Sequence, residues 1–315
     1  MQVESDPDEL RSQKRHEMKI AAPYRGHLEW RLVLQTVFCL GAWIGVIAAA
    51  AYGVLSYWIA CPLNGGLAYL FYMTLHESTH GNVSGRHSKW RFMNDVVGSV
   101  SAIPLWLSYR AHRISHMQHH AYANDPERDP DHVLAGPLSH IPLKFFMLTL
   151  LQNVAPTLAL VPGGLKLLPK KIQLARERRA KHEDPLECHY HDRFQRVCAA
   201  AFIVLSLAGF FREALWLWFV PSRIGFFLVA VVFGWLPHHP HSERGRYRDT
   251  RITLFPGATV LLRGQNHHLL HHMFPRVPHY RLPALFQEMR PTLEAQGARI
   301  EGPLAGTDAP PILLR

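Results

Sequence analysis

The sequence predicts an all-α integral membrane protein, with four transmembrane helices in two hairpins and a cytosolic, histidine-rich helical cap. Two long apolar regions and several histidine clusters at helical spacing support this prediction. The 315 residues carry a formal charge of +10, which indicates an anionic partner or a membrane surface. The hydrophobic fraction of 48% is compatible with both soluble and membrane proteins, so the distribution of apolar residues decides between these classes.

The first apolar region contains no charged side chain from Leu32 to Leu75, a run of 44 residues. At about 1.5 Å per residue, this run would make roughly 66 Å of helix, enough to cross a hydrocarbon core of about 30 Å twice. We place the turn near Tyr52-Gly53, because a turn at Pro62–Gly66 would leave the second helix too short to span.

The second apolar region runs from Val197 to Leu236 and predicts another hairpin. Its far-side loop is expected to hold Arg212 and Glu213, while Arg223 lies close enough to that interface for its side chain to reach water. The uncharged segment Phe145–Leu165 is expected to be interfacial or re-entrant. A fifth span there would export the most basic stretch of the chain.

Two prolines, Pro156 and Pro162, are expected to break that interfacial segment. Lysine and arginine residues cluster beside the predicted spans, on the side that both hairpins share. They are Lys14, Arg15, Lys19, Arg25, Arg31, Arg86, Lys89, Arg91, Lys166, Lys170, Lys171, Arg176, Arg178, Arg179 and Lys181. Because positively charged loops face the cytosol, we expect both termini and every histidine cluster to be cytosolic, with the spans in the inner (cytoplasmic) membrane.

This interpretation divides the chain into a cytosolic N-terminal lead-in (1–30), a membrane domain (31–291) and a C-terminal tail (292–315). Met1–Leu10 is polar and lacks the apolar core of a signal peptide, so we expect it to be disordered. Gly297–Arg315 is rich in glycine and proline and is expected to be loose. The four cysteines show no CxxC spacing and are interpreted as packing residues. They are Cys39, Cys61, Cys188 and Cys198.

Histidines fall in clusters that suit a metal centre: HESTH at His76–His80, HRISHMQHH at His112–His120, LPHHPH at Leu236–His241 and HHLLHH at His267–His272. Residues i, i+3 and i+4 of a helix project from one side, so each cluster directs two or three imidazoles to one point. The total exceeds what one zinc ion can use and suggests two metals. Imidazole suits zinc, copper, iron and nickel, so the ligand type leaves the metal open.

An HxxxH box at the end of the second predicted span, with two HxxHH boxes on the cytosolic side, resembles the membrane fatty acid desaturase and hydroxylase superfamily. Its members bind two irons through histidines. Three stretches are similar to desaturase-like β-carotene hydroxylases: HMQHHAYANDPERDPD from His116, LPHHPHSERGRY from Leu236, and GQNHHLLHHMFPRVPHY from Gly264. The likeness covers Leu75 to Pro291 and implies that 31–291 is a desaturase-like di-iron domain.

The resemblance implies nine iron ligands, taken from the matched positions. They are His76, His80, His116, His119, His120, His238, His268, His271 and His272. Four further histidines lie outside those positions and are expected to be neighbours of the ligands or surface groups. They are His112, His239, His241 and His267.

Acidic residues near the boxes are candidates to orient the ligands. Asp125, Asp129 and Asp131 follow the second box, where a carboxylate can accept the second N–H of a ligating imidazole. The alternative for this run is a proline-rich acidic turn. Glu77, inside the first box, is a candidate acceptor of the same kind, although HESTH also fits the HExxH motif of zinc proteases.

The resemblance implies an O₂-dependent di-iron oxygenase, and its flanking sequences favour hydroxylation of the β-ionone ring of β-carotene at C3. Desaturation of acyl lipids is the alternative, because both reactions begin with the same hydrogen abstraction. An intramembrane zinc metalloprotease and a metal transporter are more distant alternatives. The zinc protease leaves the second and third boxes unexplained, and a transporter would place ionisable residues inside the spans.

The chain carries no haem, dinucleotide or iron–sulfur motif of its own. We therefore expect an external electron donor such as a ferredoxin, with membrane lipids and a lipophilic substrate from the bilayer as further partners and no nucleic acid. The basic segment Lys166–Lys181 would suit an acidic donor or, equally, a surface of anionic lipid.

Overall fold

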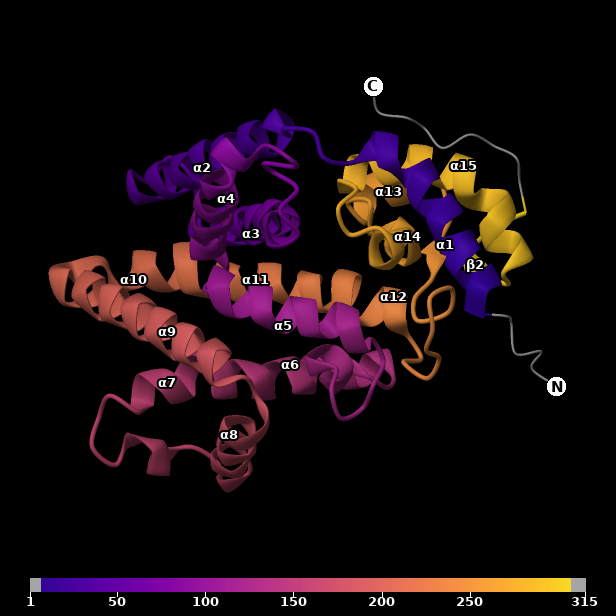
Figure 1. Ribbon diagram of the computed structural model, residues 1–315. Coiled ribbons are helices and arrows are strands. Elements are labelled where there is room, and N and C mark those ends of the chain that lie inside the picture. The colour runs from indigo at the N-terminus through magenta and orange to yellow at the C-terminus, as the bar shows by residue number, and fades with distance from the viewer. Residues whose placement is uncertain (1–6, 307–315) are drawn as a thin grey trace.

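The computed structural model describes residues 7–306 and is almost entirely helical (Figure 1). The exception is a pair of two-residue parallel strands, β1 (Ile252–Thr253) and β2 (Ile300–Glu301). Single turns of 3-10 helix join the longer helices at Ala22–Tyr24, Ser88–Trp90, Ile103–Leu105, Pro130–Leu134, Leu138–His140, Gly164–Leu167, Gln265–His267 and His279–Arg281. The predicted all-α class is therefore confirmed apart from the two short strands.

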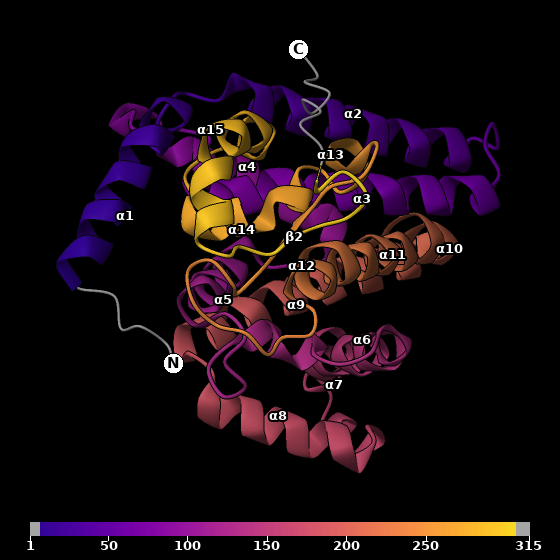
Figure 2. The ribbon, with the colours of Figure 1, turned by 90° about the vertical axis from the view of Figure 1, so that its right-hand side faces the viewer.

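The first predicted hairpin is present as α2 (Trp30–Ala51) and α3 (Tyr57–Thr79), which lie side by side (Figure 2). The turn falls at Tyr52-Gly53, as predicted. Gly53 has a φ of +76°, a left-handed conformation that glycine adopts without steric cost. Large apolar side chains of α2 stay uncovered by the rest of the chain, and Phe38 is 72% exposed.

The second hairpin pairs α9 (Pro185–Leu205) with a return leg made of α10 (Phe211–Glu213), α11 (Val220–Val229) and α12 (Leu236–His238). The predicted turn position is wrong by a few residues. The chain reverses at Gly209, with a φ of +92°, because glycine alone in this stretch tolerates that conformation easily.

Arg212 and Glu213 consequently lie in the first turn of the return leg. The Arg212 guanidinium stacks 4.3 Å from the centre of the Tyr57 ring, and the Tyr57 hydroxyl donates to Glu213 at 2.6 Å. These contacts join the tip of the second hairpin to the start of α3.

Widened π-helical turns precede three of the prolines in the helical segments. They occupy Leu150–Val154, Ala214–Phe219 and Ala230–Trp235, just before Pro156, Pro221 and Pro237. A proline lacks the N–H for the ladder and its ring crowds the carbonyl of the preceding turn, so a wider turn lets the helix continue. The expectation that Pro156 breaks its segment is therefore wrong.

That segment consists of α6 (Ile141–Thr149), the π-turn and α7 (Ala155–Leu158), so the helix ends four residues before Pro162. The remaining helices are α1 (Pro7–Ala21), α4 (Phe92–Ala102), α5 (Tyr109–Tyr122), α8 (Lys170–His182), α13 (Ala258–Leu261), α14 (His268–Met273) and α15 (Leu282–Ala295).

Among the described residues, two helical stretches are long and apolar enough to cross a membrane: α2, and the 54-residue stretch Pro185–His238. The second stretch contains the reversal at Gly209 and so comprises both legs of the second hairpin. α3 is the central helix and packs most closely against α11. At Gly225 an added Cβ would lie 2.9 Å from the Gly65 carbonyl oxygen, so small residues let the two backbones approach.

Arg223 does not extend to an interface, which corrects the expectation from sequence. Its guanidinium is turned inward and donates to Asn153 Oδ1 and to the Leu105 carbonyl, both at 2.6 Å. Asn153 in turn donates to Gln195 at 3.1 Å. A buried guanidinium needs such partners, and this network fastens the π-turn of residues 150–154 to both legs of the second hairpin.

The first and last helices of the described chain, α1 and α15, pack together. Residues 7–10 begin α1, so the expectation of disorder is wrong there, while residues 1–6 lie outside the described part. α1 lies against α15, and Ala21 is buried with Leu269 and Phe286. Gly297–Gly306 is fastened by the pairing of β2 with β1, so this part of the expected loose tail is anchored. Residues 307–315 lie outside the described range.

The four cysteines are all free thiols, and Cys39, Cys61 and Cys198 are buried. The interpretation as packing residues is confirmed for these three, whereas Cys188 is partly exposed.

Candidate metal centre

Four chain segments meet at one place and deliver the nine predicted histidines. The last turn and cap of α3 supply His76 and His80, and α12 supplies His238. α5 supplies His116, His119 and His120, and α14 supplies His268, His271 and His272. Box spacing explains this, because each helix presents its histidines on the side that faces the other three.

The nine histidines form two groups of potential ligands. The first comprises His76, His80, His116, His120 and His271, and the second His119, His238, His268 and His272. Within each group, one nitrogen of every ring lies within 4.8 Å of the others. The two groups are adjacent, since the rings of His120 and His272 stack with centroids 4.2 Å apart.

Ring nitrogens converge closely within both groups. His116 Nε2 lies 2.9 Å from His80 Nε2 and 3.1 Å from His120 Nε2, and His271 Nε2 lies 3.1 Å from His120 Nε2. In the second group, His238 Nε2 and His268 Nε2 are 3.1 Å apart. Separations of this size suit nitrogens that share a metal at a bond length of about 2.0–2.1 Å.

The surroundings of these rings also fit a metal. Both ring nitrogens of His76 and of His272, and Nδ1 of His238, are buried without a hydrogen-bond partner among the described residues. Burial lowers the pKa of His116, His120, His268, His271 and His272 well below the usual value. Burial also lowers the pKa of His80 to about 3, with help from the neighbouring cations. Neutral imidazoles with unsatisfied nitrogens are the form that binds a metal.

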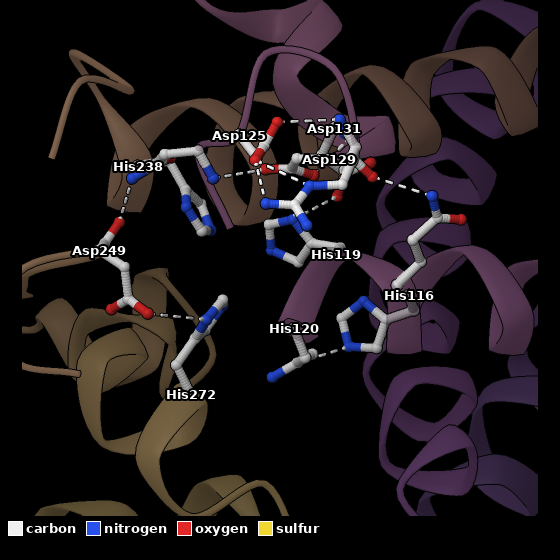
Figure 3. Close-up of polar contacts among 12 residues, drawn as sticks. His116, His119, His120, Asp125, Asp129, Asp131, His238, Asp249 and His272 are labelled. Carbon is white, nitrogen blue, oxygen red and sulfur yellow. Dashed lines mark hydrogen bonds and ion pairs between the residues drawn. The ribbon is translucent and has the colours of Figure 1, made fainter. Parts of the chain in front are cut away.

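Asp129 contacts one candidate ligand, His119, on the side of its Nδ1 atom (Figure 3). His119 Nδ1 donates to Asp129 Oδ1 at 2.8 Å, and Asp131 Oδ2 lies 3.7 Å from the same nitrogen. Burial alone would lower the pKa of His119, but the two carboxylates together outweigh it and raise that pKa. Asp129 is itself fixed by the backbone N–H groups of Asn124 and Asp131.

Asp125 has a different role from the one expected. Its carboxylate accepts from Arg128 at 2.8 Å, from Arg244 at 3.1 Å and from the backbone N–H of Glu127. It contacts none of the nine histidines, and so it stabilises the turn that carries Asp129. The run from 124 to 131 is therefore an acidic turn and a ligand support at once.

Glu77 also differs from expectation, because it faces away from the nine histidines. Glu77 Oε1 accepts from the backbone N–H of His279 at 2.9 Å and from His279 Nδ1 at 3.0 Å, and Oε2 accepts from Asn82. These bonds tie the end of α3 to the loop after α14. Glu77 thus fixes the first and third boxes relative to each other.

The remaining four histidines lie outside both groups. His112 stacks on His116 with centroids 5.2 Å apart, and His241 lies 5.9 Å from His238. His239 packs on Trp235, and His267 packs on Phe286. His112 and His241 thus lie beside members of the two groups, whereas His239 and His267 contact aromatic rings outside them.

Two supports of the centre were missed from the sequence. Asp249 Oδ2 lies 3.8 Å from His272 Nδ1, and burial raises the pKa of Asp249 to about 7 (Figure 3). Gln265 Oε1 is hydrogen-bonded to His268 Nδ1. Gln265 precedes His268 by three residues, so helical spacing could have found it. Asp249 lies in an irregular loop far along the chain from its partner, and no local pattern indicates it.

A cavity of about 600 Å³ leads to the histidines from one side. Its walls carry the carboxylates Asp129, Asp131, Glu183 and Glu187, and their apolar part comes from α6, the π-turn after it and the return leg of the second hairpin. They include Phe145, Leu148, Leu151, Phe226, Val229 and Phe233. His76, His112, His116, His119 and His268 line the same cavity. We call it the apolar cavity.

Comparisons with known proteins agree with this architecture. A model of the fatty acid desaturase family matches residues 52–302. An omega-3 fatty acid desaturase of chloroplasts from Glycine max is 27% identical over 83% of this chain and 61% of its own length. An omega-3 fatty acid desaturase from Caenorhabditis elegans is 24% identical over 77% of this chain and 63% of its own. The chain thus spans less than two thirds of these two relatives.

A third relative is the sn-1 acyl-lipid omega-3 desaturase (ferredoxin) from Synechocystis, which is 24% identical over 81% of this chain and 73% of its own length. The family match covers α3, the second hairpin and all nine histidines of the two groups. This chain belongs to the fatty acid desaturase family.

Proposed function

We propose that the protein is an O₂-dependent acyl-lipid desaturase that holds two irons through its nine clustered histidines. The observation that carries this proposal is the convergence of nine imidazoles, in two adjacent groups, at the end of an apolar cavity. Imidazole ligands leave two irons with their positive charge, and a chain-shaped apolar substrate matches the cavity wall.

The choice between desaturation and ring hydroxylation follows from the relatives. The three described above are named as fatty acid or acyl-lipid desaturases, and no carotenoid hydroxylase is among them. The sequence-based preference for C3 hydroxylation of β-carotene therefore gives way to its alternative. Ring hydroxylation remains the second candidate, on the strength of the flanking sequences after His116, Leu236 and Gly264.

The reaction removes one hydrogen from each of two neighbouring carbons of an acyl chain. With O₂, two electrons and two protons, it yields a double bond and two molecules of water. Two bound irons would supply the activation of O₂ and the abstraction of hydrogen from an unactivated C–H bond. Everything else belongs to the protein: holding the ligands, orienting the chain and excluding water.

The residues of the chain divide these tasks. Asp129 holds the Nδ1–H of His119 and so fixes which nitrogen faces the centre, and Gln265 is hydrogen-bonded to His268 in the same way. Asp249 lies near His272 at 3.8 Å without a hydrogen bond. Tyr72 and Phe233 pack edge to face, with centroids 4.7 Å apart, beside His76 at the inner end of the apolar cavity. They orient the substrate chain and keep bulk water from the ligands.

The zinc-protease alternative is disfavoured by the placement of Glu77. In an HExxH protease the glutamate activates a metal-bound water, whereas here it is held by His279 and Asn82. The transporter alternative is disfavoured because the histidines gather at the ends of the apolar helices instead of along them.

We propose further that α2, α3 and the two legs of the second hairpin cross the membrane, with both termini and the metal centre on the cytosolic side. Alkaline phosphatase fused after Lys166 or after Pro291 should be inactive, and a fusion after Gly53 should be active, because the basic segments stay inside. Active alkaline phosphatase in the fusion after Lys166 would mean that residues 141–158 cross the membrane. The histidine clusters would then no longer all lie on the same side of the membrane.

The substrate prediction is tested in one bacterial host that makes β-carotene and also supplies a ferredoxin with its reductase. Expression of the protein should introduce new double bonds into membrane acyl chains, measured by mass spectrometry of their methyl esters, and should leave β-carotene unchanged. A matched strain expresses the His271→Ala variant. New oxygens on the carotene, with unaltered acyl chains, would instead assign the protein to ring hydroxylation.

A further inference from the structure

A second cavity reaches the histidines from another side and has the opposite chemical character. It has a volume of about 820 Å³ and lies where α3 ends and the cap begins. Four arginines surround it, namely Arg86, Arg91, Arg113 and Arg276, with His80 also in its wall. We call it the arginine cavity.

The positive charge of the arginine cavity is not neutralised within the protein. All four arginines are exposed, and none lies within ion-pair distance of a carboxylate among the residues that the structure describes. Asp95 is the single carboxylate in the described lining. Clustered exposed cations attract an acidic partner and raise its rate of association.

The rim that carries these charges is rigid. Asn94 is buried and donates to Ser84 Oγ at 2.7 Å, while its Oδ1 accepts from the backbone N–H of Val83 at 3.1 Å. These bonds fix the loop between α3 and α4, on which Arg86 and Arg91 lie. A preformed set of charges binds a partner at a lower cost in entropy than a mobile one.

His80 connects the arginine cavity with the metal centre. Its ring is in the lining of the cavity, and its Nε2 lies 2.9 Å from His116 Nε2 inside the first histidine group. The His80 imidazole therefore lies between this cavity and the rest of the first histidine group.

The two cavities are separate. In the described part of the chain no residue lines both, and two members of the first histidine group face different cavities, His116 the apolar cavity and His80 the arginine cavity. An acyl chain that fills the apolar cavity cannot place its headgroup among these arginines without crossing the centre. The arginine cavity is thus free for a different partner.

We propose that the arginine cavity is the docking site for an acidic one-electron carrier protein, and that electrons enter the centre through His80. The inference rests on the proposed function, which consumes two electrons per double bond. Two carriers dock in turn, each is oxidised by one electron, and the two protons come from water. Complementary charge, a fixed rim and the short path through one imidazole all favour this surface.

The basic segment Lys166–Lys181 is the competing site. α8 lies on the side of α6 and α7, across α5 from α4, in both views (Figures 1 and 2). Ala175 of α8 borders the apolar cavity, so an electron entering there would have to pass the substrate. Its lysines suit the other expectation, contact with anionic lipid.

Two matched variants separate the sites, since each removes three positive charges. The first is Arg91→Gln/Arg113→Gln/Arg276→Gln, and the second is Lys166→Gln/Lys170→Gln/Lys171→Gln, all at exposed positions. The full-length protein in nanodiscs of neutral lipid is titrated with a plant-type [2Fe–2S] ferredoxin by interferometry at several salt concentrations. Iron content and thermal unfolding are measured on the same samples.

The arginine variant should raise the Kd for ferredoxin about tenfold and flatten its dependence on salt, whereas the lysine variant should stay within about twofold of the parent. In anaerobic stopped-flow measurements, the arginine variant should also oxidise reduced ferredoxin about tenfold more slowly below saturation. Loss of binding in the lysine variant alone, or unchanged binding in both, would overturn the proposal. The proposal would also be overturned if the arginine variant lost only its binding to vesicles of phosphatidylglycerol and kept its binding to ferredoxin. That result would assign the arginines to lipid.

The two proposals fail in distinguishable ways. If the parent protein holds two irons and desaturates with a chemical reductant, yet binds ferredoxin equally well without these arginines, only the docking site is wrong. If the parent holds no iron, the proposed function fails, whatever the binding titration shows.

Discussion

Replacing any one of His119, His120, His271 or His272 by alanine should abolish desaturation, with at least about a 100-fold loss, and leave membrane insertion intact. Each ring belongs to one of the two histidine groups, and removing a ligand should cost more than removing a group behind a ligand, which costs about 10- to 100-fold. Metal analysis should find less iron, and the measured activity is the formation of new double bonds.

His189→Ala is the matched control, since His189 is exposed on α9 and lies outside both groups. It should keep full iron content and full activity. His112→Ala is a stricter control, because that ring stacks on His116 and still belongs to neither group. Should His112→Ala lose as much iron as His120→Ala, the ligand set proposed here would be wrong.

Replacing Asp129 by alanine should cost about 10- to 100-fold in iron affinity or activity. The His119 imidazole would lose the carboxylate that its Nδ1–H contacts at 2.8 Å, so the ring could turn or adopt the other tautomer. Asp249→Asn should have a smaller effect, since its carboxylate lies 3.8 Å from His272 Nδ1. The rate of iron release to a chelator is the measurement.

Asp125→Ala is the control for both changes. It removes a carboxylate from the same acidic turn, but one that pairs with Arg128 and Arg244 and contacts none of the nine histidines. Its effect should be confined to a modest loss of thermal stability. Equal iron release from Asp125→Ala and Asp129→Ala would show that the turn matters only for folding.

The positions of the histidines could be predicted because helical spacing is a local rule. HxxxH and HxxHH place two or three rings on one side of a helix wherever that helix lies. The first hairpin was predictable for a similar reason, since an uncharged run of this length with glycine at its middle leaves few places for a turn. The turn at Gly209 could have been predicted in the same way. We placed it at Arg212-Glu213 because charged residues are expected outside the membrane.

The roles of individual acidic and basic groups could not be predicted, because they depend on contacts between distant segments. Glu77 is held by His279, which lies 202 positions along the chain. Asp249 reaches His272 from an irregular loop, and Arg223 turns inward because Asn153 and the Leu105 carbonyl are there to receive it. Sequence neighbours offer no signal for such pairs.

The choice between hydroxylation and desaturation could not be predicted from the ligand pattern either. Hydroxylation and desaturation share the first hydrogen abstraction, and placement of the substrate decides which follows. That placement is set by the walls of the apolar cavity, where α6 contributes Phe145 and the return leg of the second hairpin contributes Phe226 and Phe233. Flanking sequence alone favoured the ring hydroxylases, and the matched relatives favoured the desaturases.

Metal stoichiometry tests the central claim most directly. The full-length protein, produced in cells supplied with both iron and zinc and purified without chelators, should contain close to two irons per chain by elemental analysis. That result follows from two adjacent histidine groups of five and four members. One stoichiometric zinc per chain with no bound iron would contradict the account and favour the zinc-protease interpretation of HESTH.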